Sequence, residues 1–169
     1  FCYAIDRQKL CDFTLKGSGF PGIYGIVPPG TGTYNSTNVK GFTFDPSKAR
    51  EYLAKAGYPN GKGCPKVTLE LNSGGARNSQ VAEAIKKMLE ETLSIQVDLL
   101  TVPWAQHTEA IEAAKTDFYR LGWVADYPDA ESFLTCFYSK NATPPNYTRF
   151  RNEDFDRLYE ACLQETDTE

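Results

Sequence analysis

The stretch VTLELNSGGARNSQVAEAIKKMLEETLSIQVDLL, residues 67–100, decides the fold. From Val67 to Leu71 apolar residues alternate with polar ones, as in a strand that buries one face. After a polar turn, apolar residues recur at helical spacing over 79–92, and Ile95–Leu100 is a second strand-like run. A strand, a helix and a strand in this order predict two parallel strands joined by a helical crossover.

The same alternation extends downstream of this stretch. The spacing of apolar residues predicts a helix over 104–114, and Phe118–Val124 is expected to form a third strand. The polar turn DYPD, residues 126–129, then ends that strand. We therefore expect an α/β fold, with a mainly parallel sheet flanked by helices, in a single domain spanning residues 1–169.

The segment FDPSKAREYLAKAGYPNG, residues 44–61, contains the clearest helix signals in the chain. Asp45 is suited to cap a helix over 46–56, Pro46 fits the first helical position, and Gly57 can take the left-handed conformation that ends it. Three further helices are expected. One spans residues 2–15, one spans 130–137 with Asp129 as its cap, and the last follows a cap at Asn152. The Gly- and Pro-rich residues between about 17 and 42 are expected to form an ordered or semi-ordered surface loop.

Composition excludes several classes of function. Hydrophobic residues make up 41% of the chain, mean hydropathy is −0.46, and no apolar run is long enough to span a membrane. A nucleic-acid partner is not expected, because the net charge is −4 and the 18 basic residues are scattered.

Neither a metal nor a cofactor is expected from the cysteine and histidine pattern. The five cysteines form no CxxC pair, and His107 is the one histidine of the sequence. Cys2, Cys136 and Cys162 lie among apolar residues and are predicted to be buried free thiols. On the helix expected after Pro103, we assign His107 and Trp104 to packing or solvated positions.

Four segments together resemble one known family. They are YAIDRQKL at 3–10, IVPPG at 26–30, residues 44–61 quoted above, and GWVADYPDAESFL at 122–134. In this order and across nearly the whole chain they resemble the solute-binding proteins of peptide- and nickel-importing ABC transporters, which include oligopeptide- and dipeptide-binding proteins.

The resemblance implies one lobe of a two-lobed, type II periplasmic binding protein, with the N-terminal lobe missing from this chain. It implies that the complete protein captures oligopeptides or dipeptides between its lobes and delivers them to permease subunits, without catalysis. It also implies a periplasmic or extracellular location, with a lipid anchor as one mode of attachment.

The resemblance also implies a ligand site. In peptide-binding members the Asp of the GWxADY block pairs with the ligand's α-ammonium, and by position this is Asp126. Gly122, Trp123 and Val124 would contact the peptide backbone, with Trp123 also lining a side-chain pocket. Without the resemblance, an ordinary turn residue is the favoured interpretation of Asp126. Trp123 can also be a core residue.

The sequence is compatible with other functions. A member of the same family can bind a nickel chelate, haem or a sugar instead of a peptide. A glycoside hydrolase would use Asp126, Asp129 or Glu131 as paired carboxylates. An interaction module would bind no small ligand at all.

Overall fold

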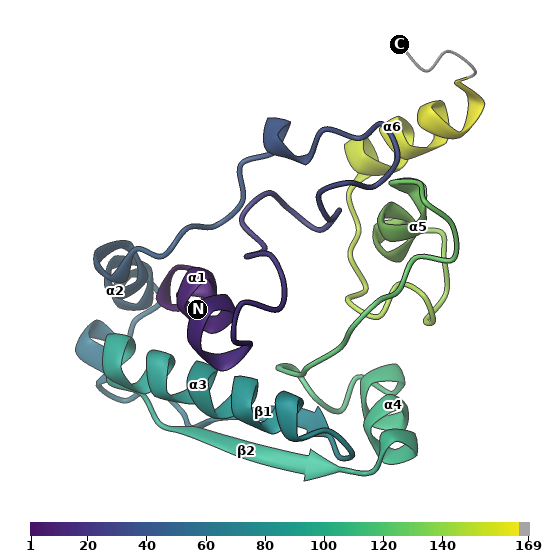
Figure 1. Cartoon of the computed structure of the whole chain (residues 1–169). Helices are drawn as coiled ribbons and strands as arrows, with labels where there is room; N and C mark the ends of the chain where they lie inside the picture. The colour runs from purple at the N-terminus through teal and green to yellow at the C-terminus, as the bar shows by residue number, and fades with distance from the viewer. Residues whose placement is uncertain (166–169) are drawn as a thin grey trace. The chain divides into compact units, whose positions relative to one another are not determined.

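The computed structural model describes residues 1–165, which fold into two compact units (Figure 1). Unit 1 contains Phe1–Ile23 and Gly41–Leu121, and unit 2 contains Tyr24–Lys40 and the chain from Gly122 onward. The single lobe over residues 1–169 stays a prediction, and residues 166–169 lie outside the described part of the chain.

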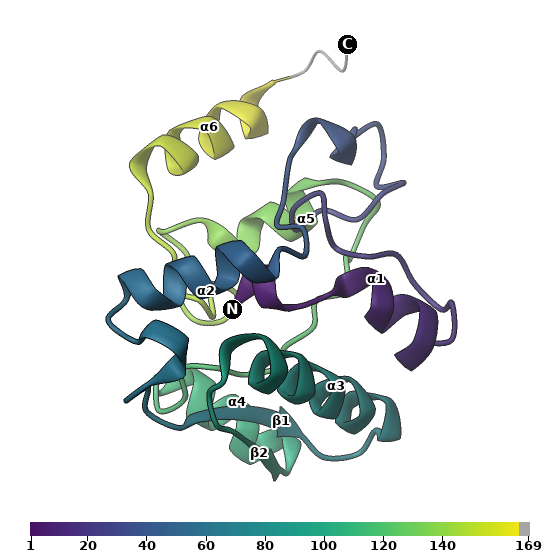
Figure 2. The same cartoon turned by 90° about the vertical axis from the view of Figure 1, so that its left-hand side faces the viewer.

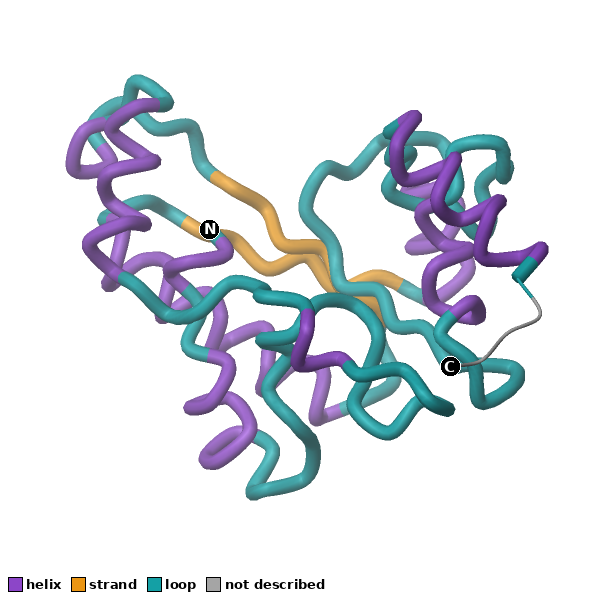
Figure 3. Tube along the Cα trace, turned by 90° about the horizontal axis from the view of Figure 1, so that it is seen from above, coloured by secondary structure: helices purple, strands orange, loops and turns teal. Residues whose placement is uncertain are grey.

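Unit 1 is built on two parallel strands, as the sequence predicts. β1 (Val67–Asn72) pairs with β2 (Val97–Val102) in a register that runs from Val67 opposite Val97 to Asn72 opposite Val102. Figure 3 shows the two strands side by side. On the other edge of β1, Tyr119 forms a parallel bridge with Glu70, so the order across the sheet is β2, β1, Tyr119.

The third strand predicted over Phe118–Val124 is wrong in extent. Pairing with β1 is limited to two hydrogen bonds, from the Glu70 N–H to the Phe118 carbonyl at 2.9 Å and from the Arg120 N–H to the Glu70 carbonyl at 2.8 Å. The next carbonyl along, that of Arg120, accepts instead from the ring of His107 at 2.8 Å. Pairing with β1 therefore ends at Arg120, well before Val124.

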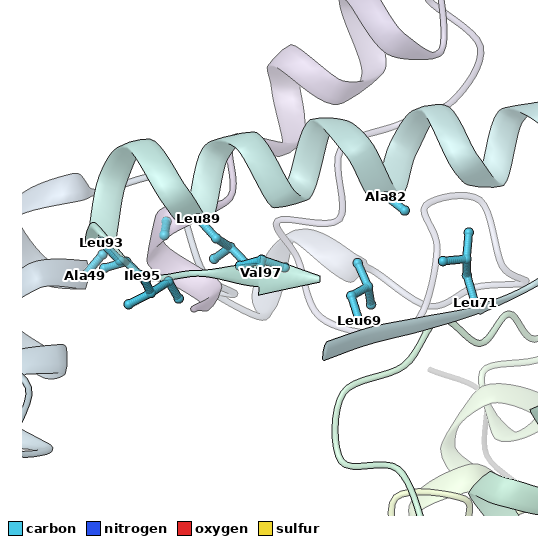
Figure 4. Packing of buried hydrophobic residues seen from close by; sticks show 9 residues of the cluster. Ala49, Leu69, Leu71, Ala82, Leu89, Leu93, Ile95 and Val97 are labelled. Carbon is cyan, nitrogen blue, oxygen red and sulfur yellow. The ribbon is translucent and has the colours of Figure 1, made fainter. Parts of the chain in front are cut away.

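Helices cover both faces of the sheet. α3 (Ala76–Leu93) runs along one face, and α2 (Pro46–Lys55) packs against α3 (Figures 1 and 2). α4 (Trp104–Glu112) reaches Glu70 on the other face. Figure 4 shows the apolar core between α3 and the strands, which consists of Ala4, Ala49, Leu69, Leu71, Ala82, Leu89, Leu93, Ile95 and Val97. Burying each large side chain of this core contributes about 1.5–3 kcal/mol.

The end signals of α2 work as predicted. The Asp45 side chain accepts the Lys48 N–H at 2.9 Å, and Pro46 is the first helical residue. After the helix, Gly57 has φ +94°, which a residue with a Cβ rarely adopts. Pro59–Gly61 then forms a 3₁₀ turn before β1.

The single helix predicted over residues 2–15 is wrong, because this segment is broken into three pieces. Cys2–Ala4 is a 3₁₀ turn, α1 spans Arg7–Lys9, and Leu10–Thr14 is a π-helical turn. Asp6 causes the first break, since its backbone is extended and its side chain accepts the Lys9 N–H at 2.9 Å. A local cap thus replaces continuous helix at this position.

Unit 2 contains short helices linked by loops. α5 (Glu131–Leu134) continues into a 3₁₀ turn at Thr135–Phe137. α6 (Glu153–Gln164) is capped by Asn152, whose side chain accepts the Phe155 N–H at 2.9 Å as predicted. In the loop of this unit, Ser36–Asn38 forms one further 3₁₀ turn.

All five cysteines are free, but their burial differs from the prediction. Cys2 and Cys162 are exposed and Cys136 is half-buried, whereas Cys11 is buried. Cys2 lies in a 3₁₀ turn of three residues and Cys162 in the last turn of α6, and their apolar neighbours in sequence did not bury them. Among residues 1–165, no helix combines the length and apolar character needed to cross a membrane.

Candidate ligand-binding site

The predicted site residues lie on one turn of unit 2, between Gly122 and α5. Ser132, which is 2% exposed, forms hydrogen bonds to two residues of this turn, Trp123 and Asp126. Its carbonyl accepts the Trp123 indole N–H at 2.6 Å, and its Oγ accepts the Asp126 backbone N–H at 3.1 Å. The indole ring and the backbone of Asp126 are therefore fixed by the start of α5.

The side chain of Asp126 is exposed and unpaired. Within the described part of the chain, its carboxylate has no hydrogen bond and no ion pair, although its backbone N–H is bound. An ordinary turn Asp caps a nearby N–H with its carboxylate, and Asp126 does not. Its carboxylate is thus available to a cation from outside.

The three residues before the turn are also open. Trp123 is 37% exposed and Val124 is 85% exposed. Between Gly122 and Ala125, no backbone N–H or C=O is hydrogen-bonded to another described residue. This short segment lies outside the sheet and has its backbone groups free to pair.

A loop segment of unit 2 lies against the turn. A Cβ placed on Gly32, which has φ +53°, would come within 2.8 Å of the Pro128 carbonyl oxygen. Next to it Thr31 is buried, and its Oγ donates to the Pro28 carbonyl at 2.9 Å. The Gly32 backbone therefore packs directly on the turn, two residues beyond Asp126.

Glu131 links the turn to α6. Its two carboxylate oxygens accept separate hydrogen bonds, one from the Tyr127 hydroxyl and one from the Tyr159 hydroxyl. The hydrogen bond to Glu131 raises the pKa of Tyr127 to about 12. Burial, followed by the hydrogen bond to Glu131, raises the pKa of Tyr159 to about 12.

The carboxylate of Asp129 is used at the start of α5, where the sequence predicts a helix cap. Its carboxylate accepts the Glu131 N–H at 2.8 Å, at the start of α5. Of the three carboxylates considered for a hydrolase, Asp129 and Glu131 are thus engaged inside the turn, and Asp126 alone is open. In residues 1–165, no three His, Cys, Asp or Glu side chains are grouped so that they could hold a metal ion.

His107 and Glu70 form a polar pair that the sequence did not predict. His107 is fully buried and Glu70 is 6% exposed, and the His107 Nδ1 lies 2.7 Å from a Glu70 carboxylate oxygen. The packing role assigned to His107 is confirmed, whereas the exposed Trp104 (52%) lies on the solvated side of α4. Glu70 is one of the polar residues that alternate with the apolar ones in its strand, so the sequence gave no reason to expect it to be buried.

The sequence matches the family described as bacterial extracellular solute-binding proteins, family 5, middle part, over residues 1–145. The chain belongs to this family.

Individual relatives bind different ligands. The chain is 27% identical to the oligopeptide-binding protein OppA of Bacillus subtilis, over 98% of this chain and 31% of that protein. It is 26% identical to the heme-binding protein A of Haemophilus influenzae, over 99% of this chain and 30% of that protein. The chain therefore spans about a third of the length of the curated relatives it matches.

Solved structures agree with the fold. The crystal structure of the periplasmic oligopeptide-binding protein OppAIV from Borrelia burgdorferi superposes with a TM-score of 0.84 at 27% identity, over 98% of this chain and 32% of that one. The expected α/β fold, a parallel sheet flanked by helices, is thereby confirmed.

Alkaline titration of tyrosine absorbance tests the Glu131 contacts. Among the ten tyrosines, Tyr127 and Tyr159 are expected to ionise near pH 12 instead of the ordinary 10.0, and replacing either by Phe should remove one late transition. Because both pKa values are raised in the folded state, their contribution to stability is complete below pH about 10 and is lost as the pH rises through about 12.

The variant Glu131→Gln separates the two tyrosines. The pKa of Tyr127 is expected to fall further than that of Tyr159, because the hydrogen bond to Glu131 is the leading cause for Tyr127 and burial is the leading cause for Tyr159. Equal falls for both tyrosines would contradict this assignment.

Proposed function

We propose that this chain is one lobe of a two-lobed binding protein that captures oligopeptides or dipeptides for an ABC importer and catalyses no reaction. The observation that carries the proposal is the Asp126 carboxylate, which is exposed and unpaired on a turn whose backbone is fixed by Ser132. A peptide's α-ammonium group is a natural partner for it, since a charge-assisted hydrogen bond between the two gains strength when water is excluded.

The free backbone of Gly122–Val124 supports a peptide over other amines. An extended peptide can add to such a segment as a strand, and main-chain hydrogen bonds of this kind do not read side chains. Trp123 is held by its indole N–H with its ring 37% exposed, which suits one wall of a side-chain pocket. Gly122, Trp123, Val124 and Asp126 then form the ligand-binding set.

The rest of the complete protein would supply the other half of the site. We place it at the periplasmic or extracellular face of the membrane, with a lipid anchor as its attachment and the permease subunits as its partners. An N-terminal lobe would close over the peptide and remove water from the Asp126 carboxylate, so residues 1–169 alone would bind peptides weakly.

A different ligand is the second candidate, because one relative is a heme-binding protein. Native mass spectrometry of the complete protein distinguishes these ligands, since a co-purified peptide, haem, nickel chelate or sugar is identified by its mass. Peptide masses are expected.

Titration calorimetry with free and amino-acetylated forms of one peptide completes the test, since acetylation removes the charge that Asp126 would recognise. Equal affinities for the two forms would refute the role of Asp126, and a haem or sugar mass would refute the peptide ligand.

A further inference from the structure

Two buried polar side chains of unit 1 are not used by the proposed site. His107 on α4 and Glu70 on β1 are 0% and 6% exposed. The His107 Nδ1 lies 2.7 Å from the Glu70 carboxylate, and its Nε2 lies 2.8 Å from the Arg120 carbonyl oxygen. Buried polar groups of this kind are costly unless every one of them is paired.

The hydrogen-bond partners fix the protons of this pair. A backbone carbonyl only accepts, so the His107 Nε2 carries a hydrogen and donates to Arg120. The contact between Nδ1 and the Glu70 carboxylate then needs one shared proton, whichever atom holds it. The pair is neutral as a whole in both arrangements, which makes its burial tolerable.

The backbone around Arg120 shows what the pair does. In a parallel ladder the Glu70 N–H to Phe118 and Arg120 N–H to Glu70 bonds would be followed by one from the Asn72 N–H to the Arg120 carbonyl. That carbonyl is bound to His107 instead, and the Arg120 side chain donates to the Asn72 side-chain oxygen at 3.2 Å. The Asn72 N–H has no hydrogen-bond partner among the described residues.

We propose that the His107–Glu70 pair is a positioning device for the ligand site, which ends sheet pairing at Arg120 and so keeps the following residues Gly122–Val124 free for a ligand. The inference rests on the proposed function for its effect on binding. Its effect on the backbone at Asn72 is independent of any ligand.

The test removes the donor to Arg120 from the complete protein without leaving a buried charge. In the double variant Glu70→Leu with His107→Phe, the Arg120 carbonyl is expected to take the Asn72 N–H, and the segment after it is drawn toward the sheet. Hydrogen exchange should then show slower exchange of the Asn72 amide. Affinity for an unmodified tripeptide should fall about tenfold, the equivalent of one good hydrogen bond.

A conservative variant separates positioning from mere packing. In Glu70→Gln, the amide can donate to the His107 Nδ1 while Nε2 still donates to Arg120, so both contacts survive without a charge. Affinity and Asn72 exchange are expected to recover to within about threefold of the unmodified protein, since the hydrogen bonds and not the charge act on Arg120.

A second double variant is available if the first does not fold. In Glu70→Gln with His107→Leu, the polar side chain at 70 lines a cavity of about 520 Å³ where water can pair with it. A folded double variant that leaves both Asn72 exchange and peptide affinity unchanged overturns the inference. An unmodified protein that binds no peptide, combined with slower Asn72 exchange in the variant, overturns the proposed function alone.

Discussion

Replacing Asp126 by Asn is expected to weaken peptide binding by the complete protein by about 2–5 kcal/mol, as measured by titration calorimetry. The Asn side chain keeps the size of Asp but loses its charge, so the α-ammonium group of the peptide would be buried without a counterion. The turn itself should be unaffected, because Asp126 is held through its backbone N–H and not through its carboxylate.

A matched variant and a modified peptide sharpen this experiment. Asp154→Asn removes the same charge from an exposed position of α6 and should leave affinity unchanged. Acetylating the peptide should lower the binding free energy of the unmodified protein about as much as Asp126→Asn does. In the Asp126→Asn variant, acetylation should cause little further loss of affinity, because both changes remove the same ion pair. Additive losses would mean that Asp126 and the peptide's amino group do not meet.

Replacing Gly61 by Ala is expected to lower the free energy of unfolding by about 3 kcal/mol. Gly61 has φ +72°, and a Cβ there would lie 2.2 Å from the Ser94 carbonyl oxygen and 2.7 Å from that of Leu93. These carbonyls end α3, so the loop before β1 would have to move away from the helix that covers the core. Urea unfolding of the complete protein, followed by tryptophan fluorescence, measures the change.

Gly63→Ala is the control for the backbone conformation. Gly63 has φ +74°, but a Cβ there would meet nothing within 4 Å. This variant carries the cost of the left-handed conformation alone, about 1–2 kcal/mol. Equal losses for both variants would show that the approach of Gly61 to α3 has no energetic weight.

The parts of the fold that local chemistry determines could be predicted from the sequence. α2 has its cap at Asp45, its Pro46 and its terminal Gly57 within one segment, and β1 and β2 show their period of two directly. The helix expected over 2–15 failed for a local reason as well, since Asp6 caps Lys9 in the middle of the apolar pattern.

The end of the third strand could not be predicted, because its last paired residue contacts a side chain from a separate helix. The pattern of Phe118–Val124 is that of a strand, yet His107 takes the Arg120 carbonyl from a helix 13 residues earlier. Nothing in the sequence around Arg120 signals this contact.

The candidate site residues stay a prediction, and the contacts that hold their turn in place could not be predicted from the sequence. Asp126 and its neighbours came from the resemblance of one short block. The contact of Gly32 with Pro128 and the bond of Tyr159 to Glu131, 28 residues apart, depend on how unit 2 folds. Supports of this kind have no spacing rule that a sequence could show.

The unpaired backbone beside Trp123 bears on how the ligand specificity of such a protein could change. If main-chain pairing supplies most of the affinity, the side chains that line the pockets can vary without a loss of affinity. Specificity and affinity would then be determined by different residues. Under the proposed function, mutations near the Trp123 ring would change which peptides bind. Mutations at Ser132 or Gly32, which contact the turn, would weaken the binding of all peptides alike.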